Sequence, residues 1–217
     1  MIERIICLII GYIFGNFQTA YLMGKLNGID IREHGSGNAG TTNTLRVLGR
    51  KAGVIVFIGD VLKCAVAIWI SRLIFGESRA DIIYILTLYA ALGTILGHNY
   101  PAFLGFRGGK GMACTAGLMV FYHPWLLVIC VSTFLIIFLT THYVSLGSVV
   151  MYGVFVGVMA ALCFTDTIGA LTGAQTAEVM IISVFMAIMA FVRHWTNIKR
   201  LMAGTESKTY LSKKNRK

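Results

Sequence analysis

The sequence predicts an all-α, polytopic membrane protein: a bundle of about seven transmembrane helices in a single domain spanning residues 1–217. Of its residues, 57% are hydrophobic and 13% are charged, whereas soluble domains carry about 25% charged residues. Mean hydropathy is +0.76. Several apolar runs approach the ~20 residues of a spanning helix, whereas a transmembrane β-strand needs only ~10 alternating residues. An ordinary soluble domain and a β-barrel are both excluded.

Seven apolar segments follow one another along the chain. The first, residues 2–24, is too long for a signal-peptide core and has no small-x-small cleavage site, so we expect an uncleaved span. The other six cover residues 52–75, 82–97, 112–122, 125–140, 146–164 and 179–192.

The fourth and fifth segments are short, with 11 and 16 residues, and only His123 and Pro124 separate them. They form either a helical hairpin or one proline-kinked span. A single span would move the basic residues from Arg193 onward to the opposite side of the membrane, against the positive-inside rule. The sequence therefore favours the hairpin.

Basic residues set the expected orientation. Lys and Arg number 19 against 9 Asp and Glu, a net charge of +10. Fifteen of the basic residues fall in alternate segments between spans or in the tail, and only Arg4, Arg72 and Arg79 fall on the other side. We expect an external N-terminus, a cytoplasmic C-terminus and a tail, residues 212–217, that is disordered and faces lipid. Anionic lipid head groups, not nucleic acid, are the expected partners of this charge.

Several polar and sulfur-containing residues lie within or beside the apolar segments. Asp60 and Lys63, three residues apart, are expected to pair, to orient the second helix and to extend a polar site. The five cysteines have no Cys-x-x-Cys spacing and are expected to be small buried packing residues. Interhelical hydrogen bonds are expected for Asn16, Gln18, Thr19, His142, Ser145 and Ser148.

The first polar loop, residues 30–46, has the composition of a phosphate-binding loop. Glycines alternate with hydroxyl and amide side chains, so the backbone can turn its N–H groups toward one anion. Arg46 adds a planar charged fork that matches two phosphate oxygens. A solvated polar loop is the alternative interpretation. The residues that form this pattern are Gly35, Ser36, Gly37, Asn38, Gly40, Thr41, Thr42 and Asn43.

The second polar segment, residues 97–111, ends in Gly108-Gly109-Lys110-Gly111 just before an apolar helix. Free backbone N–H groups, the positive end of a helix and the Lys110 ammonium favour an anion there. The spacing differs from a Walker loop, because Gly105 and Gly109 are too close and Met112 fills the hydroxyl position. The alternative is an interfacial turn from which Arg107 and Lys110 reach lipid.

The third polar segment, residues 193–208, leaves the last span. If it is helical, His194 and Asn197 share a face and can both point toward one substrate, with His194 as a proton acceptor. Alternatively, it is an interfacial amphipathic helix whose Arg193, Lys199 and Arg200 contact lipid phosphates.

Together these three segments resemble a known family, the bacterial membrane acyltransferases that use acyl phosphate as donor and glycerol 3-phosphate as acceptor. Residues 35–46 resemble its Gly-Ser-Gly-Asn-x-Gly-x-Thr-Asn-x-x-Arg motif, and residues 97–111 its Gly-His-x-x-Pro motif ending in Gly-Gly-Lys-Gly. Residues 194–208 are similar to its His-x-x-Asn-Ile-x-Arg-Leu-x-x-Gly-x-Glu-x-Lys motif. Departures are Gln18 for Pro, Thr41 for Ala and Cys64 for Gly.

The resemblance implies a seven-helix bundle in the bacterial inner membrane, with its active site facing the cytoplasm and no metal or organic cofactor. It implies production of 1-acyl-glycerol 3-phosphate and, as a partner, the enzyme that makes acyl phosphate. An acyl phosphate carries its own leaving group, so no protein nucleophile is required, and the sequence has no Gly-x-Ser-x-Gly elbow. Charge stabilisation and positioning then carry the reaction.

The expected catalytic residues are Ser36, Arg46 and Lys110 on phosphate groups and His194 and Asn197 on glycerol 3-phosphate. Further substrate contacts are expected from Gly37, Asn38, Thr42, Asn43, His98, Gly108, Gly109, Gly111, Arg200 and Glu206. An anion transporter is the competing class, but the polar groups gather on one membrane face and no broken-helix pair recurs in two halves. A non-catalytic lipid-binding scaffold would need only the basic tail.

Overall fold

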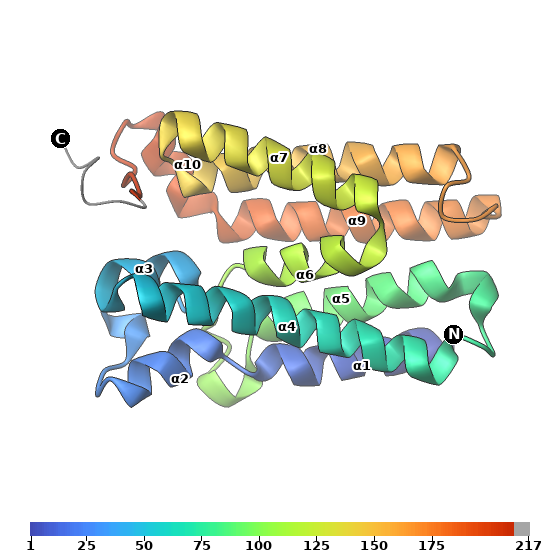
Figure 1. Ribbon diagram of the computed structural model, residues 1–217, viewed down its shortest axis with the longest axis horizontal. Coiled ribbons are helices and arrows are strands. Elements are labelled where there is room, and N and C mark those ends of the chain that lie inside the picture. The colour runs from blue at the N-terminus through green and yellow to red at the C-terminus, as the bar shows by residue number, and fades with distance from the viewer. Residues whose placement is uncertain (211–217) are drawn as a thin grey trace.

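A computed structural model describes residues 1–210, which are helical and contain no strand (Figure 1). The predicted tail, residues 212–217, lies outside the described residues. The α-helices are α1 Ile2–Asn16, α2 Thr19–Leu26, α3 Thr41–Leu48, α4 Arg50–Phe75, α5 Ile83–Asn99, α6 Met112–Tyr122, α7 Pro124–Thr141, α8 Val144–Phe164, α9 Gly173–Arg193 and α10 Trp195–Met202. Short 3₁₀ turns η1 Ile31–Glu33, η2 Ala80–Ile82 and η3 Ala102–Leu104 connect some of them.

The helices form two groups that run along the long axis of the molecule (Figure 1). Helices α1, α4 and α5 form one group and α7, α8 and α9 the other, with α6 between them in contact with α4, α5 and α7. The short helices α3 and α10 lie at one end, and the N-terminus lies at the opposite end. Apolar side chains of both groups meet α6 in one core, which includes Leu88, Leu118 and Phe155. All five cysteines are buried and free, as predicted.

Six helical segments of the described chain are long and apolar enough to cross a membrane. The predicted fourth segment is the exception, because α6 has only 11 residues, or about 17 Å at 1.5 Å per residue. His123 adopts an extended conformation between α6 and α7, and Pro124 occupies the first turn of α7, where its missing N–H costs nothing. The two helices pack against each other, so the predicted hairpin is confirmed.

The expected first span, residues 2–24, is present as a candidate span over Ile2–Leu26, but it is divided into α1 and α2. The chain breaks at Phe17 and Gln18, and the buried Gln18 amide donates to Gly15 O at 2.9 Å and to His98 O at 3.2 Å. Lys63 of α4 also donates to Phe17 O at 2.8 Å. Carbonyls at the break have lost their helical N–H partners, and side chains donate to them instead. In an apolar bundle each such carbonyl needs a hydrogen-bond donor.

Other polar residues near the ends of the spans also pair across helices, largely as predicted. Asn16 accepts a hydrogen bond from the backbone of Ala102 at 2.8 Å, and Thr19 donates to Asp60 at 3.2 Å. Ser148 is different, because its hydroxyl bonds Val144 O within α8 rather than another helix. Its expected interhelical bond is therefore absent from the described residues.

Helices α1 and α5 pack backbone to backbone through two pairs of glycines. Gly11 and Gly15 on α1 face Ala90 O and Thr94 O on α5, and Gly93 and Gly97 on α5 face Leu8 O and Tyr12 O on α1. A Cβ at any of these four positions would overlap a backbone oxygen. This is the close approach that small residues four apart permit between membrane helices, and it holds α5, with its site residues, against α1.

We expect Gly93→Ala to destabilise the protein by about 1–3 kcal/mol, because the added methyl forces two packed helices apart. Thermal unfolding of the purified protein in detergent measures the effect. Gly157→Ala on α8 is the matched control, since a Cβ there meets no atom within 4 Å and alanine favours the helix. Equal unfolding temperatures for the two variants would contradict this account of the α1–α5 contact.

Candidate active site

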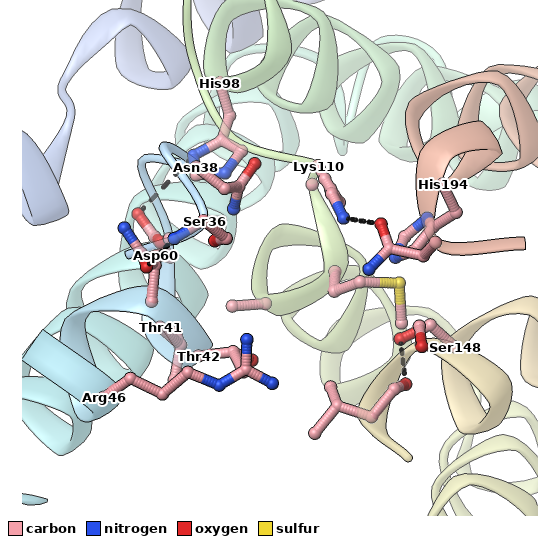
Figure 2. Close-up of a pocket in the computed structure, with 18 of the residues that line it drawn as sticks. Ser36, Asn38, Thr41, Thr42, Arg46, Asp60, His98, Lys110, Ser148 and His194 are labelled. Atoms are coloured by element: carbon pink, nitrogen blue, oxygen red, sulfur yellow. Dashed lines mark hydrogen bonds and ion pairs between the residues drawn. The ribbon is translucent and has the colours of Figure 1, made fainter. Parts of the chain in front are cut away.

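A cavity of about 100 Å³ lies at the end of the bundle that carries α3 and α10, and all three polar segments contribute to it. Figure 2 shows Ser36, Asn38 and Arg46 on one side and Lys110 and His194 on the other. We call this cavity the polar pocket. Its lining is Ser36, Asn38, Gly40, Thr41, Thr42, Asn43, Arg46, Asp60, His98, Lys110, Gly111, Met112, Ala113, Val144, Ser145, Ser148, His194, Asn197 and Glu206.

The first turns of several helices line this pocket. Helix α3 contributes Thr41 and Thr42, α6 contributes Met112 and Ala113, and α8 contributes Val144 and Ser145. The first turn of a helix carries unpaired N–H groups and the positive end of the helix dipole. With Arg46 and Lys110 beside them, these helix ends make the pocket suitable for phosphate groups.

The expectation that residues 41–46 belong to a glycine-rich loop is wrong, because they form the first part of α3. Gly40 and Gly49 bound this helix, and Leu45 packs its side chain against Gly53 of α4. Thr42 and Arg46 therefore lie one helical turn apart on one face. The spacing of Leu45 and Leu48 before Gly49 was the available sign of a short helix.

Asn43 shapes the loop that precedes α3. Its buried Oδ1 accepts from the backbone N–H of Ser36 at 2.8 Å, and its Nδ2 donates to Ile31 O at 3.1 Å and His34 O at 2.9 Å. Gly35 lies against this amide with φ +60°, where a Cβ would overlap Asn43 Oδ1. Asn43 thus presents the Ser36 hydroxyl at the exposed rim of the pocket.

Arg46 reaches the pocket while held by the end of the described chain. Its Nη2 donates to Ser207 O at 3.1 Å and to Thr209 Oγ1 at 2.8 Å. Thr209 is buried, and its backbone N–H donates to His142 O at 2.9 Å. We call residues 205–210 the C-terminal strap. The strap orients one nitrogen of the guanidinium, and the group as a whole lines the pocket.

Lys110 and Asn197 begin a chain of hydrogen bonds. Lys110 Nζ donates to Asn197 Oδ1, and Asn197 Nδ2 donates to Glu206 Oε1 at 2.7 Å. The amide of Asn197 is thereby fixed in orientation. Burial, aided by neighbouring arginines, lowers the pKa of Lys110 to about 8, so the ammonium form prevails at neutral pH.

Glu206 of the strap is the acceptor at the end of this chain. Ser145 donates to Oε1 at 2.7 Å and Arg200 donates to Oε2 at 2.7 Å. Burial would raise the pKa of Glu206, but the bonds from Arg200, Asn197 and Ser145 outweigh it and lower the pKa. Arg200 does not line the pocket and acts on it through this ion pair.

His194 lies at the junction of α9 and α10, and its ring is held in one orientation. Its Nδ1 lies 2.8 Å from Ala190 O, and because a carbonyl only accepts, Nδ1 carries the proton and Nε2 has a free lone pair. Burial, together with the charge of Lys110, lowers the pKa of His194 to about 4. A neutral imidazole with an accepting Nε2 therefore lines the pocket at neutral pH.

A buried polar network lies beside the pocket. The predicted pair of Asp60 and Lys63 is confirmed at 2.9 Å, and Lys63 Nζ also lies 2.8 Å from His98 Nδ1. An ammonium only donates, so Nδ1 of His98 accepts and its Nε2 carries the proton. Asp60 and His98 both line the pocket, so the pair extends the polar site as expected.

The glycines of the second segment provide clearance. A Cβ at Gly108 would overlap His98 O, and one at Gly109 would overlap His98 Nε2. The N–H of Gly109 already donates to His98 O at 3.0 Å, so in this structure it is not free for a substrate. Gly37, Gly108 and Gly109 do not line the pocket, whereas Gly111, with φ +78°, does.

Arg193 does not have the partners that the alternative interpretation, an interfacial helix on lipid phosphates, gave it. Instead of facing lipid phosphates, its guanidinium donates to the backbone carbonyls of Gly108 and Gly109. Those two carbonyls are fixed acceptors next to the end of α9. Hydrogen bonds to them offset the free-energy cost of removing the guanidinium from water, which an apolar contact would not do.

An apolar groove of about 300 Å³ adjoins the polar pocket and shares Thr41, Thr42, Met112, Ala113, Val144 and Ser148 with it. Its remaining walls come from α3, α4, α6, α7 and α8 and the strap: Leu45, Phe57, Ala116, Met119, Cys130, Val131, Phe134, Leu135, Phe138, Met151 and Thr209. No sequence pattern marked these residues as a group, because they look like ordinary apolar positions of separate spans.

The chain matches a known family over most of its length. The family model described as "Glycerol-3-phosphate acyltransferase" matches residues 5–204. A protein named glycerol-3-phosphate acyltransferase from Clostridioides difficile (strain 630) is 40% identical over 206 residues, which cover 94% of each chain. One of the same name from Thermoanaerobacter sp. (strain X514) is 41% identical over 201 residues, or 92% of each chain.

Two solved structures are similar in fold. The crystal structure of PlsY (YgiH), described as an integral membrane glycerol 3-phosphate acyltransferase in its glycerol 3-phosphate form, has a TM-score of 0.79 and 31% identity. The similarity covers 95% of this chain and 96% of that one. The lysophosphatidic acid form of the same protein has a TM-score of 0.77, with 95% of each chain covered.

Proposed function

Since the chain belongs to the glycerol-3-phosphate acyltransferase family, we propose that it transfers a fatty acyl group from acyl phosphate to the 1-hydroxyl of glycerol 3-phosphate. The products are 1-acyl-glycerol 3-phosphate and phosphate. The observation that carries this proposal is that the polar pocket and the apolar groove are adjacent and share six lining residues. The pocket suits phosphate groups and the groove an acyl chain.

Phosphate groups of donor and acceptor would bind among the helix ends that line the pocket. Arg46 offers a planar fork, Lys110 a half-buried ammonium and Ser36 a hydroxyl at the rim. His98 adds an N–H donor at Nε2. Charge that develops on the donor phosphate as it leaves is stabilised by these preorganised groups, which need no rearrangement during the reaction.

We propose direct attack by the glycerol 3-phosphate hydroxyl, without an acyl-enzyme. The one pocket serine that donates to a carboxylate is Ser145, and its acceptor, Glu206, already receives bonds from Asn197 and Arg200. A carboxylate so stabilised is a weak base and does not activate a hydroxyl well. Acyl phosphate is a mixed anhydride with a good leaving group, and it needs no further activation by a nucleophile.

We also propose a location in the bacterial inner membrane with the pocket facing the cytoplasm. Arg46, Lys110, Arg193, Lys199 and Arg200 all belong to the end of the bundle that holds the pocket, which is the distribution that the positive-inside rule requires. Because acyl phosphate is a labile intermediate with an apolar tail, the enzyme that produces it is the partner we propose at this membrane face.

Acyl phosphate is expected to be the working donor, and acyl-CoA a poor one. A thioester has no phosphate on the reacting carbonyl, so it leaves part of the Ser36, Arg46 and Lys110 set unpaired. Initial rates of the purified protein with labelled glycerol 3-phosphate and each donor measure the preference. Direct attack also predicts intersecting initial-rate plots and no acylated protein when the acceptor is withheld.

Three results would contradict this proposal. Equal rates with acyl-CoA would show that the donor phosphate is not recognised. Parallel initial-rate plots with a trapped acyl-serine or acyl-cysteine would require a covalent intermediate. Absence of turnover with either donor would favour a transporter or a lipid-binding scaffold.

A further inference from the structure

Arg193, the last residue of α9, connects the third polar segment to the second. Its Nε donates to Gly109 O at 3.0 Å, and its Nη2 donates to Gly108 O at 3.0 Å and to Gly109 O at 2.6 Å. The guanidinium also lies 5.2 Å from the centre of the Tyr100 ring. A planar fork that binds two consecutive carbonyls and stacks on an aromatic ring is fixed in position.

The two carbonyls determine where the neighbouring N–H groups point. In a trans peptide the C=O of one residue and the N–H of the next point in opposite directions. Because Gly109 O faces Arg193, the N–H of Lys110 points away from Arg193, and it has no acceptor within residues 1–210. Lys110 lines the polar pocket, directly before the unpaired N–H groups that begin α6.

The opposite side of this loop is closed by α5. Gly109 N–H donates to His98 O, and a Cβ at Gly108 or Gly109 would overlap His98. Residues 108–109 therefore lie between His98 and Arg193, with no side chain of their own to hold them. Glycine has the widest backbone freedom of any residue, so without the guanidinium fork these peptides have many accessible orientations.

We propose that Arg193 is a positioning residue for acyl transfer: by binding the carbonyls of Gly108 and Gly109, it aims the Lys110 backbone N–H and side chain at the reacting phosphate. This inference rests on the proposed function and adds to it a residue that contacts no substrate. Arg193 does not line the pocket, so its effect on the reaction is exerted through the loop.

Two substitutions separate the geometry of the fork from its charge. Arg193→Lys keeps the charge but cannot bind both carbonyls in one plane, and Arg193→Gln loses the charge as well. We expect both variants to lower kcat about 10²-fold at saturating concentrations of both substrates, since small misplacement of a catalytic group has effects of this size. Arg107→Gln, which removes an exposed charge from the same segment, is the control and should keep the wild-type kcat.

The pH profile separates the effect of the Arg193 charge on Lys110 from the geometry of its fork. Besides burial, the charges of Arg200, Arg193 and Arg46 lower the pKa of Lys110, and Glu206 raises it. Loss of the Arg193 charge in Arg193→Gln should therefore move the alkaline limb of kcat/KM to higher pH. In Arg193→Lys, which keeps the charge, that limb should stay where it is while kcat falls.

Hydrogen–deuterium exchange of the empty proteins tests the loop directly and needs no turnover, so its failure is distinct from failure of the proposed function. Residues 105–111 should exchange faster in both variants than in wild type and in Arg107→Gln. Wild-type kcat in Arg193→Lys, with unchanged exchange in this segment, would overturn the inference. A lower unfolding temperature with unchanged kcat and unchanged pH profile would also overturn it, because Arg193 would then serve stability alone.

Discussion

Replacing Lys110 with alanine is expected to lower kcat about 10²- to 10³-fold while the protein still inserts and folds. The half-buried Lys110 ammonium lines the polar pocket beside the first turn of α6, and it donates to Asn197. Its loss removes a full positive charge from the place where, in the proposed reaction, charge develops on the leaving phosphate. Steady-state kinetics with acyl phosphate and glycerol 3-phosphate measure the change.

Lys199→Ala is the matched control for this experiment. Lys199 lies exposed on α10 over the Trp195 ring, and its removal should leave kcat close to wild type. The pH dependence of the wild type gives a second check: the Lys110 ammonium loses its proton as the pH rises through about 8, so kcat/KM should fall above that pH. Near-normal turnover of Lys110→Ala would mean that this charge serves lipid binding or topology.

With His194 as the main proton acceptor, His194→Ala is expected to lower the rate about 10²- to 10⁴-fold. The bond from Nδ1 to Ala190 O leaves Nε2 as the accepting atom. The pKa of His194 is lowered to about 4, so the ring is neutral and able to accept a proton at pH 6 and above. The rate should therefore show no fall near pH 6 that is caused by protonation of His194. Rates and pH profiles of wild type and variant measure both effects.

His123→Asn is the control, because His123 lies between α6 and α7 and asparagine also caps a helix well. A loss below tenfold in His194→Ala, with weaker binding of glycerol 3-phosphate, would contradict the base role. The donor phosphate would then be the proton acceptor, and His194 would only position the acceptor substrate.

The overall bundle followed from the sequence because its main causes are local. Apolar runs define the long helices, and Pro124 together with the basic residues from Arg193 onward was enough to choose a hairpin over a single span. The break at Phe17 was not predictable in this way. It depends on Gln18 and Lys63, whose partners are backbone carbonyls that only the folded bundle brings within reach.

The same distinction applies to the site. Lys110, His194 and Asn197 stand in motifs of unusual composition, and the structure brings them together. Lipid contact was only one alternative for Arg193, and the sequence does not show the backbone carbonyls that its guanidinium binds in the folded protein. The apolar groove was missed for a related reason: Ala116, Met119 and Met151 are ordinary core residues until the helices that carry them are placed side by side.

The C-terminal strap has a consequence for the biogenesis of this protein. Glu206 accepts hydrogen bonds from Asn197 and Ser145, and Ser207 and Thr209 accept hydrogen bonds from Arg46. The strap therefore orients side chains of a pocket that residues 36–46 also line. A chain is synthesised from its N-terminus, and the strap leaves the ribosome after residues 36–46 and after α10. All the helices of the described residues can therefore be in the membrane before the pocket exists, and a nascent or truncated chain that lacks the strap has no assembled polar pocket.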